Sequence, residues 1–142
     1  MKFDVIVIPE PDDNGFSEEP YVKMCDDYHE MNDAIGCDYS DRVYVEQLSE
    51  SRFLNLFVDD EGKLKNRPVN NTVMIWIKSL GFDLAQTFDG TVVLCVIDDD
   101  GESIHFTLNE LEALMEQLNK AHCEGQGKVL EPSEPFMFVT GF

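Results

Sequence analysis

The chain has 142 residues, a length that usually forms one domain. Hydrophobic residues make up 43% of the chain, which is enough for a core and argues against a disordered protein. The formal net charge of −19 disfavours direct binding to nucleic acid or to an anionic membrane and favours a basic partner, although such charge can also serve solubility alone.

The N-terminal half predicts strands around one short helix. In chain order, the predicted elements are a strand at 2–8, an acidic surface loop at 9–20, a strand at 21–25, a helix at 26–36, and strands at 41–49 and 52–58. The helix has the clearest ends, because Asp27 can cap its first turn, Glu30 completes a capping box, and Gly36 can end it.

The C-terminal half predicts two further helices. Its elements are a turn at 59–62, a helix at 69–81, strands at 91–97 and 103–106, a helix at 107–121, and a last strand in FMFVTGF at 136–142. Asn70 or Asn71 caps the first of these helices, which Trp76 anchors in the core. Thr107 and Glu110 form a capping box on the second helix.

These elements predict an α+β fold, with an antiparallel or mixed sheet of five to six strands and two to three packed helices. We expect a single α+β domain over residues 1–122 and a partly ordered C-terminal extension over 123–142. The N-terminal stretch has only a short apolar segment interrupted by Asp4, which indicates a strand rather than a secretion signal. No run of 18 apolar residues exists, so we expect a cytoplasmic protein.

No familiar pattern for catalysis or metal binding occurs in the sequence. The acidic turns each lack a ligand that a calcium loop needs, and the three histidines accompany no nucleophile motif. The four cysteines have no C-x-x-C spacing, which favours reduced thiols, and Cys95 lies in an apolar run where a thiol should be inert. We therefore expect no enzyme activity, no metal site and no cofactor.

Rows of acidic side chains are the main candidate for a binding surface. Acids four residues apart on a helix lie about 6 Å apart along its axis, and acids two residues apart on a strand lie about 6.6 Å apart. Backbone phosphates of DNA present charge on a similar scale. A plain solvated surface is the alternative. The candidate partner-binding residues are Asp59, Asp60, Glu61, Asp98, Asp99, Asp100, Glu102, Glu112 and Glu116.

The order of elements and several motifs resemble a family known only as a domain of unknown function. The resemblance covers residues 20–100, with a strand, Glu-Gly-Lys-Leu, a spacer, Pro-x-Asn and a later Gly-Thr strand. The segment after residue 102 departs from the short family members and is expected to be an addition. The matching residues are Glu61, Gly62, Lys63, Leu64, Pro68, Asn70, Gly90 and Thr91.

The resemblance implies a setting rather than a reaction. Such families are carried largely on plasmids, conjugative elements and phages, where strongly acidic small proteins are often DNA mimics that inhibit restriction or CRISPR defence. We therefore expect a non-enzymatic inhibitor that binds a basic nucleic-acid-binding protein, such as a defence nuclease. The alternative is a sponge that sequesters a nucleotide signal through Lys63, Lys65 and Arg67. The same basic residues could pair with acids of a second copy, which favours a homodimer.

Overall fold

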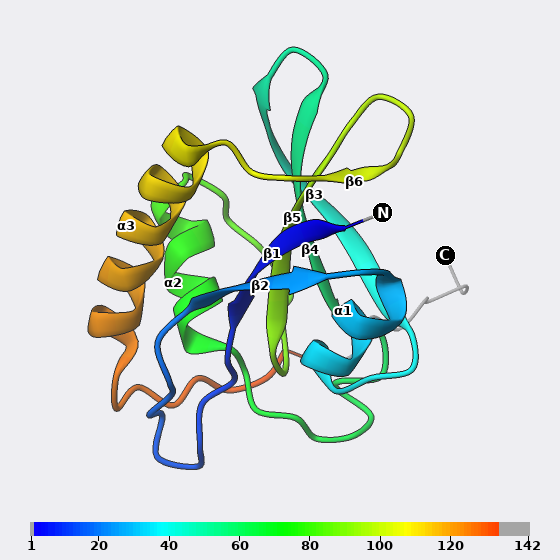
Figure 1. Ribbon diagram of the computed structural model, residues 1–142. Coiled ribbons are helices and arrows are strands. Elements are labelled where there is room, and N and C mark those ends of the chain that lie inside the picture. Colours follow the sequence, from blue (N-terminus) through cyan, green and yellow to red (C-terminus); the bar gives the residue numbers. More distant parts are fainter. Residues whose placement is uncertain (1, 134–142) are drawn as a thin grey trace, which may run out of the picture.

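A computed structural model of the chain describes residues 2–133 as a six-stranded antiparallel sheet with three helices, which confirms the predicted α+β class (Figure 1). The last strand expected at 136–142 lies outside the described residues. The strands are β1 (Phe3–Ile8), β2 (Tyr21–Cys25), β3 (Ser40–Ser49), β4 (Arg52–Asp59), β5 (Val92–Ile97) and β6 (Ser103–Ile104). The helices are α1 (Tyr28–Ile35), α2 (Asn71–Ser79) and α3 (Leu108–Gly125).

The strands follow the order β2-β1-β5-β4-β3, and β6 pairs with the last residues of β5. β1 pairs with the first half of β5, so β1 and β6 share one side of that strand. The carboxylate of Asp4 accepts a 2.8 Å hydrogen bond from the backbone N–H of Phe106. Because this N–H is taken up by a side chain, the strand predicted over 103–106 ends at Ile104.

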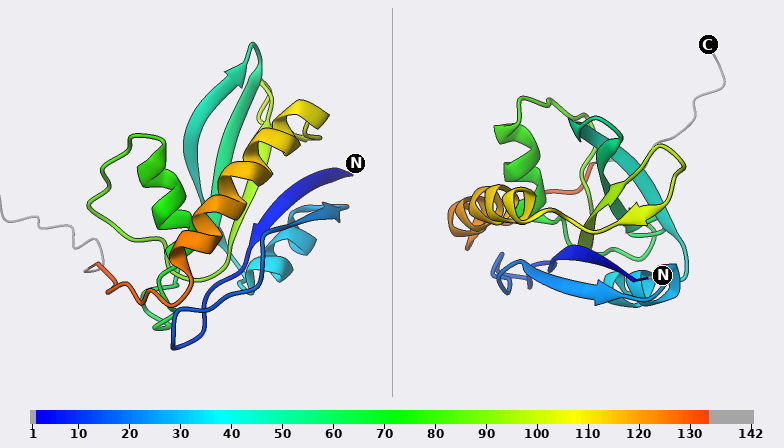
Figure 2. Two further views of the ribbon diagram at one scale, coloured as in Figure 1. Left: turned by 90° about the vertical axis from the view of Figure 1, so that its left-hand side faces the viewer. Right: turned by 45° about the horizontal axis from the view of Figure 1, so that its top comes forward.

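Each face of the sheet carries its own hydrophobic core, because successive residues of a strand point to opposite sides (Figure 2). α2 and α3 cover one face, where Trp76 is fully buried as predicted. α1 covers part of the other face with Met31 and Ile35. Burial on both faces explains why β1 and β5 are apolar almost throughout.

Most of the predicted helix caps are confirmed. The Asp27 side chain accepts from the N–H of the third helical residue of α1, and Gly36 ends that helix with a left-handed φ of 84°. The predicted capping box of α1 is wrong in its second half, because the Glu30 side chain accepts from the N–H of Asp26 instead of Asp27. Thr107 and Glu110 form the complete capping box of α3. Asn70, rather than Asn71, caps α2.

The chain after α3 packs against the domain. α3 continues to Gly125, across the boundary predicted at residue 122. The buried side-chain amide of Asn71 donates hydrogen bonds to the backbone carbonyls of Gly15, Gly125 and Lys128 at 2.9, 2.8 and 2.9 Å. One asparagine at the start of α2 therefore fixes the N-terminal loop, the end of α3 and the segment that follows it.

Candidate functional site

The segment between β4 and α2 folds into tight turns that hold most of the family motif. The backbone N–H of Gly62 donates to the carbonyl of Asp59, and the N–H of Arg67 donates to the carbonyl of Gly62. A Cβ atom at Gly62 would lie 2.8 Å from the carbonyl oxygen of Asp89. Glycine therefore lets this turn pack directly on the segment before β5.

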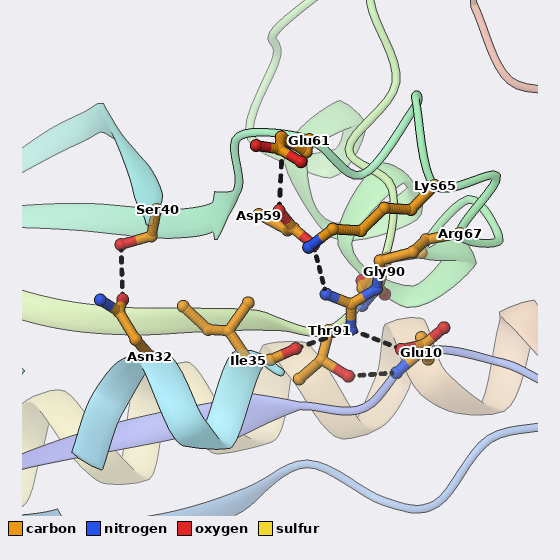
Figure 3. Close-up of polar contacts among 11 residues, drawn as sticks. Glu10, Asn32, Ile35, Ser40, Asp59, Glu61, Lys65, Arg67, Gly90 and Thr91 are labelled. Atoms are coloured by element: carbon orange, nitrogen blue, oxygen red, sulfur yellow. Dashed lines mark hydrogen bonds and ion pairs between the residues drawn. The ribbon is translucent and has the colours of Figure 1, made fainter. Parts of the chain in front are cut away.

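The guanidinium group of Arg67 lies at the centre of this cluster (Figure 3). It donates to the carboxylates of Asp59 at 2.9 Å and Glu10 at 2.6 Å, and to the carbonyl oxygen of Ile35 at 2.6 Å. Burial alone would lower the pKa of Arg67, but the bonds to Glu10 and Asp59 outweigh it and raise the pKa. A Cβ atom at Gly90 would lie 2.5 Å from the Nε atom, so Gly90 provides the space that Arg67 fills.

Asp59 is an internal ion-pair residue and not part of an exposed acidic surface, which corrects the prediction. Its side chain is 0% exposed. The carboxylate accepts from Lys65 at 2.9 Å, from Arg67, and from the backbone N–H of Glu61 at 2.9 Å. Burial would raise the pKa of Asp59, but these three donors together hold the pKa below its ordinary value.

The predicted ligand-binding cations also have acidic partners within the chain. The ammonium group of Lys63 donates to Asp89 at 3.1 Å and to the carbonyl and hydroxyl oxygens of Thr87 at 2.9 Å each. Lys65 and Arg67 both bind Asp59. A cavity of ≈ 280 Å³ lies beside Lys63 and Arg67, but internal carboxylates already neutralise both cations. The three residues therefore do not form an open basic patch.

The rest of the motif divides into framework and exposed residues. The side-chain amide of Asn70 donates to the carbonyl oxygens of Ile8 and Gly90 at 2.9 and 3.0 Å, which joins the start of α2 to β1 and to the chain entering β5. Leu64, by contrast, is 76% exposed, and Glu61 beside it is also exposed. Most of the motif therefore serves the fold, and Leu64 with Glu61 is the part that solvent can reach.

The predicted acidic residues lie on three separate surfaces. Asp60 and Glu61 follow β4 at one end of the sheet. The β5–β6 turn, 98–102, lies at the other end, because β4 and β5 are antiparallel. Glu112 and Glu116 are exposed on α3, on the sheet face opposite α1. The structure therefore brings Asp98, Asp99, Asp100 and Glu102 together but does not align all the candidates in one row.

The four acids of the β5–β6 turn have different roles. One carboxylate oxygen of Asp98 accepts from the backbone N–H groups of Asp100 and Glu102 at 2.9 and 3.0 Å, which shapes the turn. Asp99 accepts from the hydroxyl of Ser51 and thereby links this turn to the β3–β4 turn. Asp100 and Glu102 are exposed, and their carboxylates accept no hydrogen bond within residues 2–133.

The described part of the chain offers little reactive chemistry. Burial raises the pKa of the Cys37 and Cys95 thiols to about 11 each, and all four cysteines are free. Among residues 2–133, no three His, Cys, Asp or Glu side chains gather where they could hold a metal ion. Over the same residues, no helix has the length and apolar character needed to span a membrane.

Sequence analysis did not identify the acidic partners of the motif cations. Glu10 and Asp89 lie far from Arg67 and Lys63 along the chain, so no local pattern could indicate the pairs. It also overlooked an exposed aromatic residue, Tyr44, on β3. The alternation of that residue with buried and half-buried valines was the available signal.

The whole cluster falls within one recognised family. A family model described as "Domain of unknown function (DUF3846)" matches residues 2–119, which includes most of α3 and extends well beyond the expected range of 20–100. Residues 103–119, with most of α3, are therefore part of the family and not an addition. No curated protein and no solved structure matches the chain. The chain belongs to the DUF3846 family, whose function is unknown.

Proposed function

We propose that this protein is a non-enzymatic inhibitor that binds the basic surface of a nucleic-acid-binding protein. In its specific form, it is a cytoplasmic DNA mimic carried by a plasmid, conjugative element or phage and directed against a defence nuclease. The observation that carries this proposal is the internal pairing of the cations. Lys63, Lys65 and Arg67 are tied to carboxylates of the same chain, so they do not form a basic surface beside the exposed acids.

The internal pairs leave a large excess of acid on the rest of the chain. Arg52 adds a further internal pair, with 2.6 Å between its guanidinium and the carboxylate of Glu110. The internal clusters join four cations to four carboxylates, so the other 25 acids and six cations carry the net charge of −19. Such a field steers a basic partner toward the protein and keeps nucleic acid away. Salt should weaken the complex, because exposed charges are screened within about 10 Å at 0.1 M ionic strength.

The exposed acids form two pairs that can be tested separately. One pair lies on the β5–β6 turn and the other on the outer side of α3. On α3, Glu112 and Glu116 are one helical turn apart, about 6 Å along the axis. The turn residues Asp100 and Glu102 present a second, more compact pair.

The nucleotide sponge receives less support. An anion in the cavity beside Lys63 and Arg67 would have to compete with carboxylates that already bind both cations. The homodimer that was expected from the same cations loses its main argument for the same reason. Both remain predictions.

The test is affinity capture from nuclease-treated bacterial lysate, with washes at about 0.05 M and about 0.5 M salt and mass spectrometry of retained proteins. We expect a basic nucleic-acid-binding protein that is retained at low salt and lost at high salt. Two variants with equal charge change locate the contact: Asp100→Asn with Glu102→Gln, and Glu112→Gln with Glu116→Gln. One of them should weaken binding more than tenfold at low salt.

A matched control neutralises two acids in the loop before β2, Glu18→Gln with Glu19→Gln, and should leave binding within twofold of the original. Retention of no basic protein at low salt would overturn the proposal. So would a retained partner whose binding is unchanged by salt, because an interaction between exposed charges must weaken as they are screened.

A further inference from the structure

Part of the sheet face under α1 is left uncovered. α1 packs over β1, β5 and the end of β4 but does not reach the far part of the β3–β4 hairpin. The β3–β4 and β5–β6 turns project from the sheet at the end away from α1, and the bond between Ser51 and Asp99 joins them (Figure 1). An open hollow of ≈ 430 Å³ lies between the strands at this end. Its lining residues include Arg42, Tyr44, Phe53, Asn55, Asp98 and Asp99.

Two aromatic rings form one side of the hollow. Tyr44 of β3 and Phe53 of β4 have ring centroids 6.5 Å apart and an angle of 52° between their planes. Tyr44 is 59% exposed, so much of its side chain is open to solvent. An open aromatic face attracts cations, and a planar guanidinium can also stack on it.

The floor of the hollow contains a nearly buried amide with unused hydrogen-bonding capacity. Asn55 lies directly opposite Tyr44 across β3 and β4 and is only 7% exposed. Its amide nitrogen donates to the carbonyl of Phe53 at 3.3 Å, but its oxygen accepts no hydrogen bond within residues 2–133. Thr72 Oγ1 is the one side-chain oxygen or nitrogen that is fully buried without a partner among residues 2–133, so the Asn55 oxygen is open to solvent and an incoming donor can reach it.

The acidic edge of the hollow has free acceptors as well. Asp98 uses one carboxylate oxygen to hold the turn, and Asp99 uses one oxygen to bind Ser51. The second oxygen of each carboxylate accepts no hydrogen bond among the described residues. Two carboxylates, one amide oxygen and one aromatic face therefore border the same hollow. All are suited to a group that is cationic, planar and rich in N–H donors.

We propose that this hollow binds an arginine side chain of the protein partner. The proposal rests on the proposed function, because it assumes that the partner is basic, and it specifies where and how that partner docks. Arginine fits better than lysine, since its guanidinium can donate to carboxylate and amide oxygens while it lies against the ring of Tyr44. The hollow therefore supplies specificity that acidic rows alone do not provide.

Arg42 offers a test of whether the occupant of the hollow is a cation or an anion. It is exposed, it lines the hollow, and no carboxylate among residues 2–133 lies within ion-pair distance of it. For a cationic occupant, Arg42 is a repulsive neighbour, so Arg42→Glu should tighten binding about tenfold through the reversed charge. For an anionic occupant such as a nucleotide, the same substitution should weaken binding. The two occupants thus predict opposite results.

The probe is N-acetyl-L-arginine amide, titrated into the isotopically labelled protein and followed by amide NMR shifts. We expect saturable shifts in the β3–β4 hairpin and in residues 98–101, with a Kd of about 1 mM. The corresponding citrulline amide has the same shape without the charge and should bind at least about tenfold more weakly. Tyr44→Ala should weaken arginine binding about tenfold. Tyr39→Ala removes a tyrosine that is 73% exposed and does not line the hollow, so it is the matched control.

Weaker arginine binding by the Arg42→Glu variant, or shifts that fall outside the hollow, would overturn the proposal. The outcome is separable from that of the proposed function. If capture from lysate yields a basic partner whose binding is unchanged by Tyr44→Ala and Arg42→Glu, the hollow is not its docking site, although the proposed function stands. If N-acetyl-L-arginine amide binds in the hollow but capture from lysate yields no basic partner, the proposed function fails and the arginine site stands.

Discussion

Replacing Arg67 by methionine should reveal how strongly the ion-pair cluster stabilises the fold. The substitution keeps most of the aliphatic volume but removes three hydrogen bonds, to Asp59, Glu10 and the carbonyl of Ile35. Loss of one partner from a buried ion pair typically costs about 3–5 kcal/mol. Lys65 remains bonded to Asp59, and Glu10 is 32% exposed, so we expect the lower end, about 3 kcal/mol.

Urea unfolding can measure this loss through the fluorescence of Trp76, the only tryptophan, which is fully buried in the native protein. With an m-value of about 2 kcal/mol per M, the midpoint should fall by about 1.5 M while m stays constant. Arg42→Met is the matched control, because Arg42 is exposed and should change the free energy of unfolding by less than about 0.5 kcal/mol. A loss of under about 1 kcal/mol for the Arg67 variant would refute the reasoning, since the cluster would then not act as a buried ion pair.

Three further predictions concern other buried groups. Because the folded pKa of Asp59 lies below its ordinary value of 3.8, the ionised carboxylate stabilises the fold fully above that value and loses this effect as pH falls through the folded pKa. The difference in urea midpoint between the protein and Asp59→Asn should therefore shrink from about pH 6 to about pH 2, and a constant difference would contradict the assignment. Asn71→Ala should remove three hydrogen bonds, leave the carbonyl of Lys128 without a donor, and cost about 3 kcal/mol. It should also speed amide hydrogen exchange around Gly127 and Lys128, and unchanged exchange would show that the asparagine does not hold this segment. With a thiol reagent at about pH 8, the exposed Cys123 should react first. Cys95 should react only when the protein unfolds, because burial raises the pKa of its thiol to about 11. Rapid reaction of Cys95 in the native protein would contradict its burial.

Local patterns predicted the secondary structure well where the chemistry is local. The caps at Asp27 and Thr107 bond to residues three positions away, so their partners were visible in the sequence. Apolar spacing on the last helix is less reliable. Leu108, Leu111, Leu114, Met115 and Leu118 follow helical spacing, yet Leu108 is 71% exposed. It lies at the first position of α3, where the chain has only just left the sheet. Spacing identifies one side of a helix but not how far along it the neighbouring layer extends.

The candidate site was predicted less well, because its chemistry depends on contacts between distant segments. The sequence placed Asp59 with its acidic neighbours and Lys63, Lys65 and Arg67 in a basic patch, and both groups looked exposed. In the fold, Asp59 is buried beneath Lys65 and Arg67, Arg67 also binds Glu10, and Lys63 binds Asp89. A buried charged residue stabilises the fold through its internal partner and is not available to a binding partner. The order of residues in the chain does not show which charged residues will be buried in this way.

The sequence by itself determined the α+β class, the helix caps and the excess of acid, because each follows from local spacing or from composition alone. Only the tertiary structure decided which charges are available to a partner. It paired the cations of the motif internally, separated the acids onto three surfaces, and set Tyr44 beside Asn55 across two strands. The physical reason is that charge, exposure and hydrogen-bonding capacity depend on neighbours in space, and those neighbours lie on elements far apart in the chain.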